Sequence, residues 1–362
     1  MVINNLALNN YRNYLSEEIS FSEGINILYG DNAQGKTNIL EAIYMLATTK
    51  SHRTSKDKEI INLSFDEGHI KASVNKRCIN YRIDMHLRRN KSKGVAIDQV
   101  PVRKTSQLMG MVNVVLFSPE DLDIIKNGPS ERRRFIDMEL CQLNKIYYSN
   151  LSNYNKILNQ RNNLLKNIYY DKSQMDMLDV WDAQLVDFGI KIIKDRNNFI
   201  DKINEIILDI HKRLTGDKEI IAVKYDKNVT EEKFAKELSL KRDIDLRYQN
   251  TQVGPHRDDI SFYINDMDVK TYGSQGQQRT VALSLKLAEI ELVKELIGDN
   301  PILLLDDVMS ELDSSRRDAL LSSINDIQTI ITCTGYDDFI KERLTVDKVY
   351  MVSKGTIQQV NL

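Results

Sequence analysis

Residues 30–37, GDNAQGKT, constrain the fold of this chain more than any other stretch. They fit the phosphate-binding pattern of two glycines separated by four residues and followed by Lys and Thr. The apolar run Ile25–Tyr29 before them predicts a buried strand, and the helical spacing of apolar residues over Asn38–Leu46 predicts a helix after them. A strand, a glycine-rich loop and a helix in this order indicate a P-loop α/β fold. The alternative is an ordinary glycine turn with an unrelated lysine.

The chemistry of a P-loop assigns a role to each part of this stretch. Glycines let backbone N–H groups close around phosphates, and the helix N-terminus adds the positive end of its dipole. We expect Lys36 to reach the β- and γ-phosphates of ATP and to be catalytic, and the Thr37 hydroxyl to ligate Mg²⁺. Arg12, from the turn between the first two predicted strands, is added to the nucleotide-binding candidates. The loop candidates are Gly30, Asp31, Asn32, Ala33, Gln34, Gly35, Lys36 and Thr37.

A second acidic motif follows the apolar run Ile302–Leu305. Apolar residues that end in two acids are typical of a buried parallel strand whose carboxyl end presents carboxylates to Mg²⁺. We predict that Asp306 lies on the metal side and that Asp307 is catalytic, because it orients or deprotonates the attacking water. The alternative is a strand end that happens to be acidic.

The segment Ser274–Gln278, SQGQQ, precedes a strongly helical stretch, Val281–Ile297. A hydroxyl, a glycine and side-chain amides ahead of a helix form a second phosphate-binding cap. Two head-to-tail copies would let each Ser274 complete the ATP site of the other, so ATP would favour a homodimer. The alternative is that Ser274 only caps its own helix. The nucleotide-binding candidates here are Ser274, Gln275, Gly276 and Gln277.

Length and composition exclude several classes of protein. A chain of 362 residues is long enough for two lobes. The three cysteines are far apart and form no C-x-x-C pair, which argues against a disulfide framework or a zinc site and favours reduced, cytosolic thiols. No run approaches the eighteen or so apolar residues of a membrane span, and the N-terminus has no signal-like pattern. We therefore expect a cytoplasmic protein without membrane partners.

The net charge of −2 argues against a uniformly basic nucleic-acid binder, so any nucleic-acid surface must be local. Residues 71–104 contain ten Lys or Arg against two acids, and residues 50–58 are also basic. These two stretches are the candidate nucleic-acid surface. The alternative is an ordinary solvated face.

The remaining patterns predict the other elements. Strands are expected at Ile3–Leu8, Ile19–Tyr29, Ile79–Leu87 with a hairpin turn at Gly94, Val112–Phe117 and Glu219–Tyr225. Heptad-like spacing predicts one long helix from Phe135 to Ile168 and another from Leu178 to Leu214, ending near Gly216. At ~1.5 Å per residue these helices form an antiparallel pair with arms of roughly 50 Å.

Taken together, these motifs resemble the RecF family of DNA repair ATPases, relatives of the ABC-type heads of SMC proteins. The phosphate loop and its helix, the YGSQGQQRT segment and the ILLLDDVMSELD segment are similar to that group's phosphate loop, signature loop, and metal-binding strand with a dimer-contact loop. The resemblance is most specific over Pro119–Leu122 and from Gly128 to Asp137. No His follows Thr334 and no Gln lies in Ser118–Asp121, so the γ-phosphate sensor is unassigned.

The resemblance implies an architecture. An ABC-type P-loop ATPase lobe of α/β class, built from residues 1–130 and 246–362, is interrupted by a mostly helical second lobe, 131–245, with a short antiparallel coiled-coil-like hairpin. The Asp306–Asp307 pair, where transporters often have Asp-Glu, suggests slow hydrolysis used for timing.

The resemblance also implies a function. It is ATP-gated binding of gapped or junction DNA as a dimer in recombinational repair, together with RecO and RecR, to help load RecA onto single strands. One rival is a transporter or metabolic P-loop ATPase. The other is an ATP-dependent nuclease of the overcoming-lysogenisation type, which would need a further acidic domain that we do not expect in a chain ending at Leu362.

Overall fold

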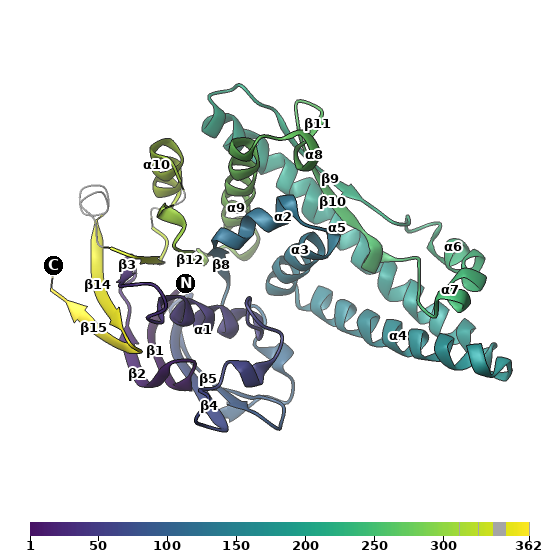
Figure 1. Cartoon of the computed structure of the whole chain (residues 1–362), viewed down its shortest axis with the longest axis horizontal. Coiled ribbons are helices and arrows are strands. Elements are labelled where there is room, and N and C mark those ends of the chain that lie inside the picture. Colours follow the sequence, from purple (N-terminus) through teal and green to yellow (C-terminus); the bar gives the residue numbers. More distant parts are fainter. Residues whose placement is uncertain (311, 325, 336–344, 362) are drawn as a thin grey trace. The chain divides into compact units, whose positions relative to one another are not determined.

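The computed structural model describes residues 1–310, 312–324, 326–335 and 345–361. The chain divides into two compact units, residues 1–121 with 286–362 and residues 122–285. Each is described by itself below (Figure 1). Residues 246–285, which the sequence assigned to the ATPase lobe, fall in the second unit. Compact units need not coincide with functional domains, so the predicted domain boundaries stay a prediction.

A six-stranded sheet with the order β15-β14-β3-β13-β12-β8 forms one layer of the first unit. All neighbours pair in parallel except β15, which pairs antiparallel with β14. The expected buried strand β12 lies between β13 and β8, and all five of its residues are buried. Its strands are β3 Ile25–Tyr29, β8 Val114–Phe117, β12 Ile302–Asp306, β13 Thr329–Cys333, β14 Val346–Ser353 and β15 Thr356–Val360.

A second sheet of the same unit has the order β2-β1-β4-β5-β6-β7 and is antiparallel throughout. The segment expected as a strand at Ile19–Tyr29 is therefore two strands in different sheets. The prediction of a hairpin turn at Gly94 was wrong. Gly94 is the first residue of β6, and the turn precedes it. The strands are β1 Val2–Tyr11, β2 Tyr14–Ser20, β4 Glu67–Lys76, β5 Ile79–Arg88, β6 Gly94–Ile97 and β7 Val100–Pro101.

One hydrophobic core joins both sheets of this unit to helix α1, Lys36–Thr48. The helix buries ten of its thirteen residues, around most of its circumference, as expected for a helix enclosed by other elements. Its first residue follows the glycine-rich loop directly, so the core fixes the place where the loop ends. The unit also holds α10, Ser314–Ser323, and 3-10 turns at Asp57–Glu59, Thr105–Gln107, Pro119–Asp121 and Val308–Ser310.

The second unit is mainly helical. The predicted first long helix is broken at Asn144, whose side chain accepts hydrogen bonds from the N–H groups of Ile146 and Tyr147 and so begins a new helix. The predicted second helix ends as expected, at a left-handed Gly216. The helices are α2 Leu122–Lys126, α3 Pro129–Leu143, α4 Lys145–Tyr170, α5 Met177–Thr215, α6 Phe234–Leu240, α7 Arg242–Tyr248 and α8 Val269–Tyr272.

Helices α4 and α5 run side by side as the expected antiparallel pair (Figure 1). The arms are unequal, about 40 Å and about 60 Å, because α4 has 26 residues and α5 has 39. A small sheet of β9 Ile221–Asp226, β10 Asp259–Ile264 and β11 Met267–Asp268 completes the unit. Helix α9, Gln275–Ile297, continues from this unit into the first. None of the helices in the described ranges is both long and apolar enough to cross a membrane.

Buried arginines hold the second unit together. Arg196 of α5 lies 2.8 Å from Asp137 and 3.1 Å from Asp258, and it also donates to the carbonyl of Pro255. Arg132 forms a bidentate pair with Asp259 at 2.6 and 2.9 Å. The motif that resembles the family most specifically, 128–137, therefore supplies residues to this network. Removing one partner of such a buried pair costs about 3–5 kcal/mol.

Arg161, which interrupts the apolar stripe of α4, is the centre of a second buried network. Its side chain is fully buried and contacts Asp182 at 2.6 Å, Asp245 at 2.7 Å and the Thr251 hydroxyl at 2.8 Å. The first carboxylate lies on α5 and the second on α7. Arg161 thus ties three helices of the unit together.

Candidate functional site

The glycine-rich loop lies between β3 and α1, as the sequence predicted. Gly30 has φ 151° and Gly35 has φ 121°, values that L side chains rarely adopt. A Cβ at Gly30 would lie 2.2 Å from the carbonyl oxygen of Val352. One at Gly35 would lie 2.7 Å from Asn13 and Tyr14. Both positions therefore require glycine.

Lys36 is only 4% exposed and lies over the loop that precedes it. Its ammonium group donates to the carbonyls of Gly30 at 2.6 Å and Asp31 at 3.0 Å. The charge is therefore held against the backbone of the loop, and its contact with phosphate stays a prediction.

The turn between β1 and β2 supports the loop from outside. Asn13 Nδ2 donates to the Gln34 carbonyl at 2.7 Å, and the Tyr14 hydroxyl donates to the Gly35 carbonyl at 3.0 Å. Burial raises the pKa of Tyr14, so its hydroxyl stays a donor. The Gln34 side chain accepts from the N–H of Lys354 at 2.6 Å. The sequence does not predict this role for Asn13 and Tyr14, because both lie far from the loop along the chain and no local pattern links them to it.

Arg12 binds a carboxylate of α1. Its guanidinium donates to both oxygens of Glu41, at 2.6 and 2.8 Å, and to the Glu59 carbonyl at 2.8 Å. Burial alone would raise the pKa of Glu41, but the hydrogen bonds from Arg12 and Ser51 hold it below its ordinary value. Arg12 thus anchors the turn that supports the loop, and a direct contact of Arg12 with nucleotide stays a prediction.

The two acidic motif residues lie at the carboxyl end of β12. Asp306 is 9% exposed, and its Oδ1 accepts from the hydroxyls of Thr37 at 2.9 Å and Thr332 at 2.8 Å. Thr332 lies on the neighbouring strand β13 and also accepts the N–H of Asp307 at 3.0 Å. The fold thus brings together Thr37 and Asp306, which are 269 positions apart in the chain. Sequence reasoning did not assign Thr332 a role.

Asp307 has a left-handed backbone conformation, with φ 53°. This is uncommon for a residue other than glycine, and such conformations cluster at functional sites. The Ser310 hydroxyl donates to its carbonyl at 2.7 Å and holds the turn. Glu311, in the predicted dimer-contact loop, lies outside the described residues.

The SQGQQ segment lies in the second unit, and most of it is helix. Helix α9 begins at Gln275, so Gln275, Gly276 and Gln277 form its first turn and do not precede it. The Ser274 hydroxyl accepts from the N–H of Gln277 at 3.2 Å, and Gln277 Oε1 accepts from the N–H of Ser274 at 2.9 Å. This reciprocal pair is a capping box. Ser274 therefore caps helix α9. The residue is also exposed, and its contact with a phosphate of another subunit stays a prediction.

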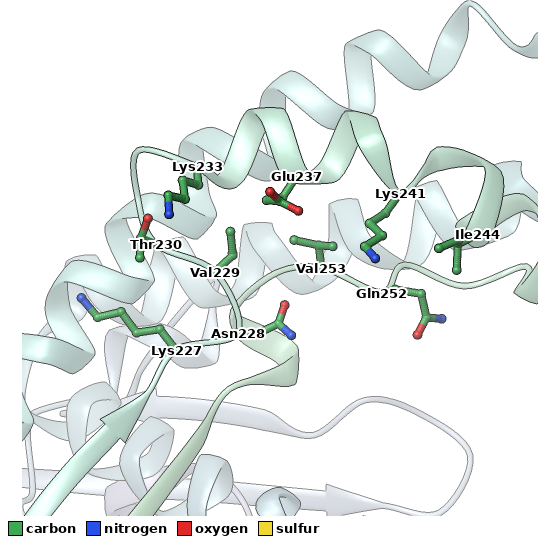
Figure 2. A pocket seen from close by; sticks show the side chains of 10 residues that line it. All are labelled: Lys227, Asn228, Val229, Thr230, Lys233, Glu237, Lys241, Ile244, Gln252 and Val253. Carbon is green, nitrogen blue, oxygen red and sulfur yellow. The ribbon is translucent and has the colours of Figure 1, made fainter.

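The second unit also contains a polar cleft of about 570 Å³. Figure 2 shows Lys227, Lys233 and Lys241 around it, together with Glu237. Lys227 already pairs with Glu231 at 3.4 Å. The lining contains none of the predicted site residues, and we assign it no ligand.

Comparison with known proteins identifies the family of this chain. Residues 2–358 match the family model of the RecF/RecN/SMC N terminal domain. The DNA replication and repair protein RecF of Lachnoclostridium phytofermentans is 57% identical over 359 residues, which are 99% of this chain and all of that protein.

Solved structures agree with this match. A structure described as the recombination mediator protein RecF with ATP in the RecFOR pathway has a TM-score of 0.93 at 34% identity, covering 99% of this chain and 97% of that one. An SMC head domain from Pyrococcus furiosus, with a TM-score of 0.56 at 16% identity over 99% of this chain and 96% of that one, shares the fold. The predicted ABC-type α/β fold with a helical hairpin is confirmed. The chain belongs to the RecF family.

Proposed function

We propose that this chain is an ATP-dependent DNA-binding protein of replication and repair that hydrolyses ATP slowly, as a switch. The observation that carries this proposal is the hydrogen bond between Thr37 and Asp306, at 2.9 Å, next to a loop that encloses the Lys36 ammonium. A structure of a family member described with ATP supports the choice of nucleotide.

The oxygen atoms of Thr37 and Asp306 fit Mg²⁺ as ligands. Hydroxyl and carboxylate oxygens are the ligands this ion prefers, usually with several waters and nucleotide phosphates. Thr37 and Asp306 would hold the ion, which would neutralise charge on the bound phosphates. Lys36 and the loop N–H groups bind the phosphates, Thr332 orients the Asp306 carboxylate, and Asp307 holds the attacking water and accepts its proton.

For the finer biology we propose that the chain binds gapped or junction DNA as an ATP-gated homodimer, in the cytoplasm at the nucleoid. It then acts with RecR and RecO to help load recombinase onto single-stranded DNA. The pathway named for the solved relative supports this assignment. DNA binding with ATP, with ADP and without nucleotide, on gapped, duplex and single-stranded oligonucleotides, tests it. A transporter or metabolic ATPase would show no ATP-dependent DNA affinity on any of the three.

Asp307→Asn is expected to retain ATP binding and to slow hydrolysis by about 10²- to 10⁴-fold, because the amide keeps the shape and loses the base. Asparagine tolerates the left-handed backbone at this position as well as aspartate does. Asp306→Asn is the matched comparison, and it should weaken the Mg²⁺ dependence of ATP binding instead. Equal steady-state hydrolysis by Asp307→Asn and the parent protein would assign the water to another residue.

The basic stretches give a second prediction. Arg89 donates to the carbonyls of Asn62, Leu63 and Phe65, so its charge supports a turn, whereas Lys71, Lys91 and Lys104 are exposed. Reversing these three lysines to Glu should lower DNA affinity. It should also flatten the dependence of log affinity on log salt by about 0.9 for each phosphate that the variant no longer neutralises.

The control reverses three exposed lysines of the helical hairpin, Lys156, Lys166 and Lys194, with the same change in net charge. Fluorescence anisotropy over a salt series measures both triples. If only the hairpin triple flattens the salt dependence, the DNA surface lies in the second unit. Arg132 offers no alternative surface, because it is buried against Asp259.

A further inference from the structure

Glu67, His69 and His86 form a cluster on the two central strands of the antiparallel sheet. One ligand atom from each lies within 4.8 Å of the others. His69 and His86 are direct partners in the β4–β5 pairing, and Glu67 precedes His69 by two residues, so all three share one face of the sheet. The two rings stack with centroids 4.2 Å apart, and His86 Nε2 lies 2.9 Å from Glu67 Oε2.

The surroundings of the cluster leave room for an ion. On the next strand the partner of His86 is Gly94, which has no side chain, and the nearest atom to a Cβ built there would be Arg88 Nη2 at 3.7 Å, a guanidinium nitrogen that donates to the Ser92 carbonyl at 3.0 Å. The neighbouring carboxylate of Asp84 is engaged by Arg82 at 3.0 and 3.1 Å. Glu67 is exposed, and both histidines are half-buried. Rotation of these side chains is therefore enough to bring the three ligand atoms closer together.

We propose that Glu67, His69 and His86 bind one divalent transition-metal ion of the Zn²⁺ class. Two imidazoles and a carboxylate, with water in the remaining position, are a ligand set that zinc uses in proteins. Mg²⁺ and Ca²⁺ prefer all-oxygen sites, so the two nitrogen ligands discriminate against them. Metal ligands at bonds of about 2.0–2.2 Å must lie roughly 3.2–3.6 Å apart, which requires only a small contraction of the observed cluster.

The cluster shares no residue with the predicted nucleotide site. Bound metal would join β4 to β5 on their outward face, and the ion would also place positive charge beside the basic stretch 71–104. The alternative is that no metal binds. The two histidines then only stack on each other, His86 and Glu67 share one hydrogen bond, and the cluster is an ordinary weak cross-strand contact. Metal titration separates these two interpretations.

The test uses the tag-free full chain, treated with a chelator, in a Cys78→Ser background that removes an exposed thiol. Calorimetric titration with ZnCl₂ is expected to show one saturable site with a Kd below about 0.1 mM. His69→Asn and His86→Asn should each weaken binding at least about tenfold. Ser73→Asn, an outward position on the same strand, is the matched control and should bind as the parent does.

Thermal unfolding gives a second readout. Zn²⁺ should raise the Tm of the parent and of Ser73→Asn, and at the same Zn²⁺ concentration it should raise the Tm of both histidine variants less, because a ligand of the native state stabilises it by mass action, more strongly the tighter it binds. Circular dichroism confirms that each variant is folded. Absence of saturable binding by the parent, or equal affinity in the histidine variants, would overturn the proposal.

Discussion

Replacing Lys36 with alanine is expected to weaken ATP binding by about 10- to 150-fold for each charge-assisted hydrogen bond lost to the phosphates, and to remove hydrolysis. Such a bond contributes about 1.5–3 kcal/mol, which converts to that range of Kd. Lys36 is the only basic residue among residues 30–37, so no other part of the loop supplies an equivalent charge. Titration with a fluorescent ATP analogue and a phosphate-release assay measure the two effects.

Lys36→Ala should still fold. The residue begins α1, where alanine is the best helix former, and the glycines that shape the loop are unchanged. The variant loses the hydrogen bonds to the Gly30 and Asp31 carbonyls, which cost about 0.5–1.5 kcal/mol each. Lys294→Ala removes an ammonium that pairs with Glu291 on α9 and is the control for loss of a lysine. A folded Lys36→Ala variant with parental ATP affinity would place the nucleotide elsewhere.

The parts of the site that follow from local pattern were predictable from the sequence. Strand β3, the loop and α1 are contiguous, and glycine spacing reports the backbone conformation directly. The same holds for β12, where an apolar run ending in Asp306 and Asp307 gives both the burial of the strand and the two carboxylates at its end. Local pattern does not show that these two segments lie two strands apart in one sheet. That arrangement could be predicted from the resemblance to a known fold.

The interactions that support the loop could not be predicted. Asn13, Tyr14 and Thr332 act through hydrogen bonds to residues at least 21 positions away, and their own neighbours in the chain carry no pattern that reports this. Arg161 shows the same limit, since a single charge in an apolar stripe looks like an interruption until Asp182 and Asp245 are placed beside it. Pairings of this kind depend on tertiary structure.

Two errors came from turn and capping chemistry. Continuous apolar spacing predicted one helix where Asn144 ends α3 and begins α4, although asparagine is among the preferred capping residues. The start of α9 was placed six residues late, at Val281, because Gly276 and the glutamines around it were interpreted as loop. A serine followed three residues later by glutamine is the capping-box pattern and marks the true start.

Ser274→Arg is expected to abolish ATP-driven dimerisation and the ATP dependence of DNA binding, while nucleotide binding by the monomer stays near the parental level. In the proposed head-to-tail dimer, the γ-phosphate held by one phosphate loop is contacted by Ser274 of the other subunit, and a bulky cation would block that approach. Sedimentation velocity with ATP and with ADP measures the association.

The substitution also removes the cap of α9, at a cost of about 0.5–2 kcal/mol. Ser274→Ala carries the same loss of the cap without the bulk, so it separates stability from steric exclusion. It should dimerise more strongly than Ser274→Arg. Equal loss of dimer in both variants would mean that association requires the Ser274 hydroxyl, through its cap or its contact with the phosphate, and not only the space beside it.

Mixing Ser274→Arg with Lys36→Ala subunits tests the trans contact most sharply. A mixed dimer contains one composite site with both lesions and one with neither, so ATPase activity should return although each variant alone is inactive. Random association at equal concentrations would make half of the dimers mixed, each with one intact site of two, and would give about a quarter of the parental activity. Because neither homodimer has an intact composite site to hold it together, mixed dimers are favoured, and recovery between about a quarter and about a half of the parental activity is expected. A contact of Ser274 within its own subunit predicts no recovery, because every site in the mixture would then carry one lesion. Inactivity of the mixture, or monomers at every ATP concentration for the parent protein, would exclude the trans role of Ser274.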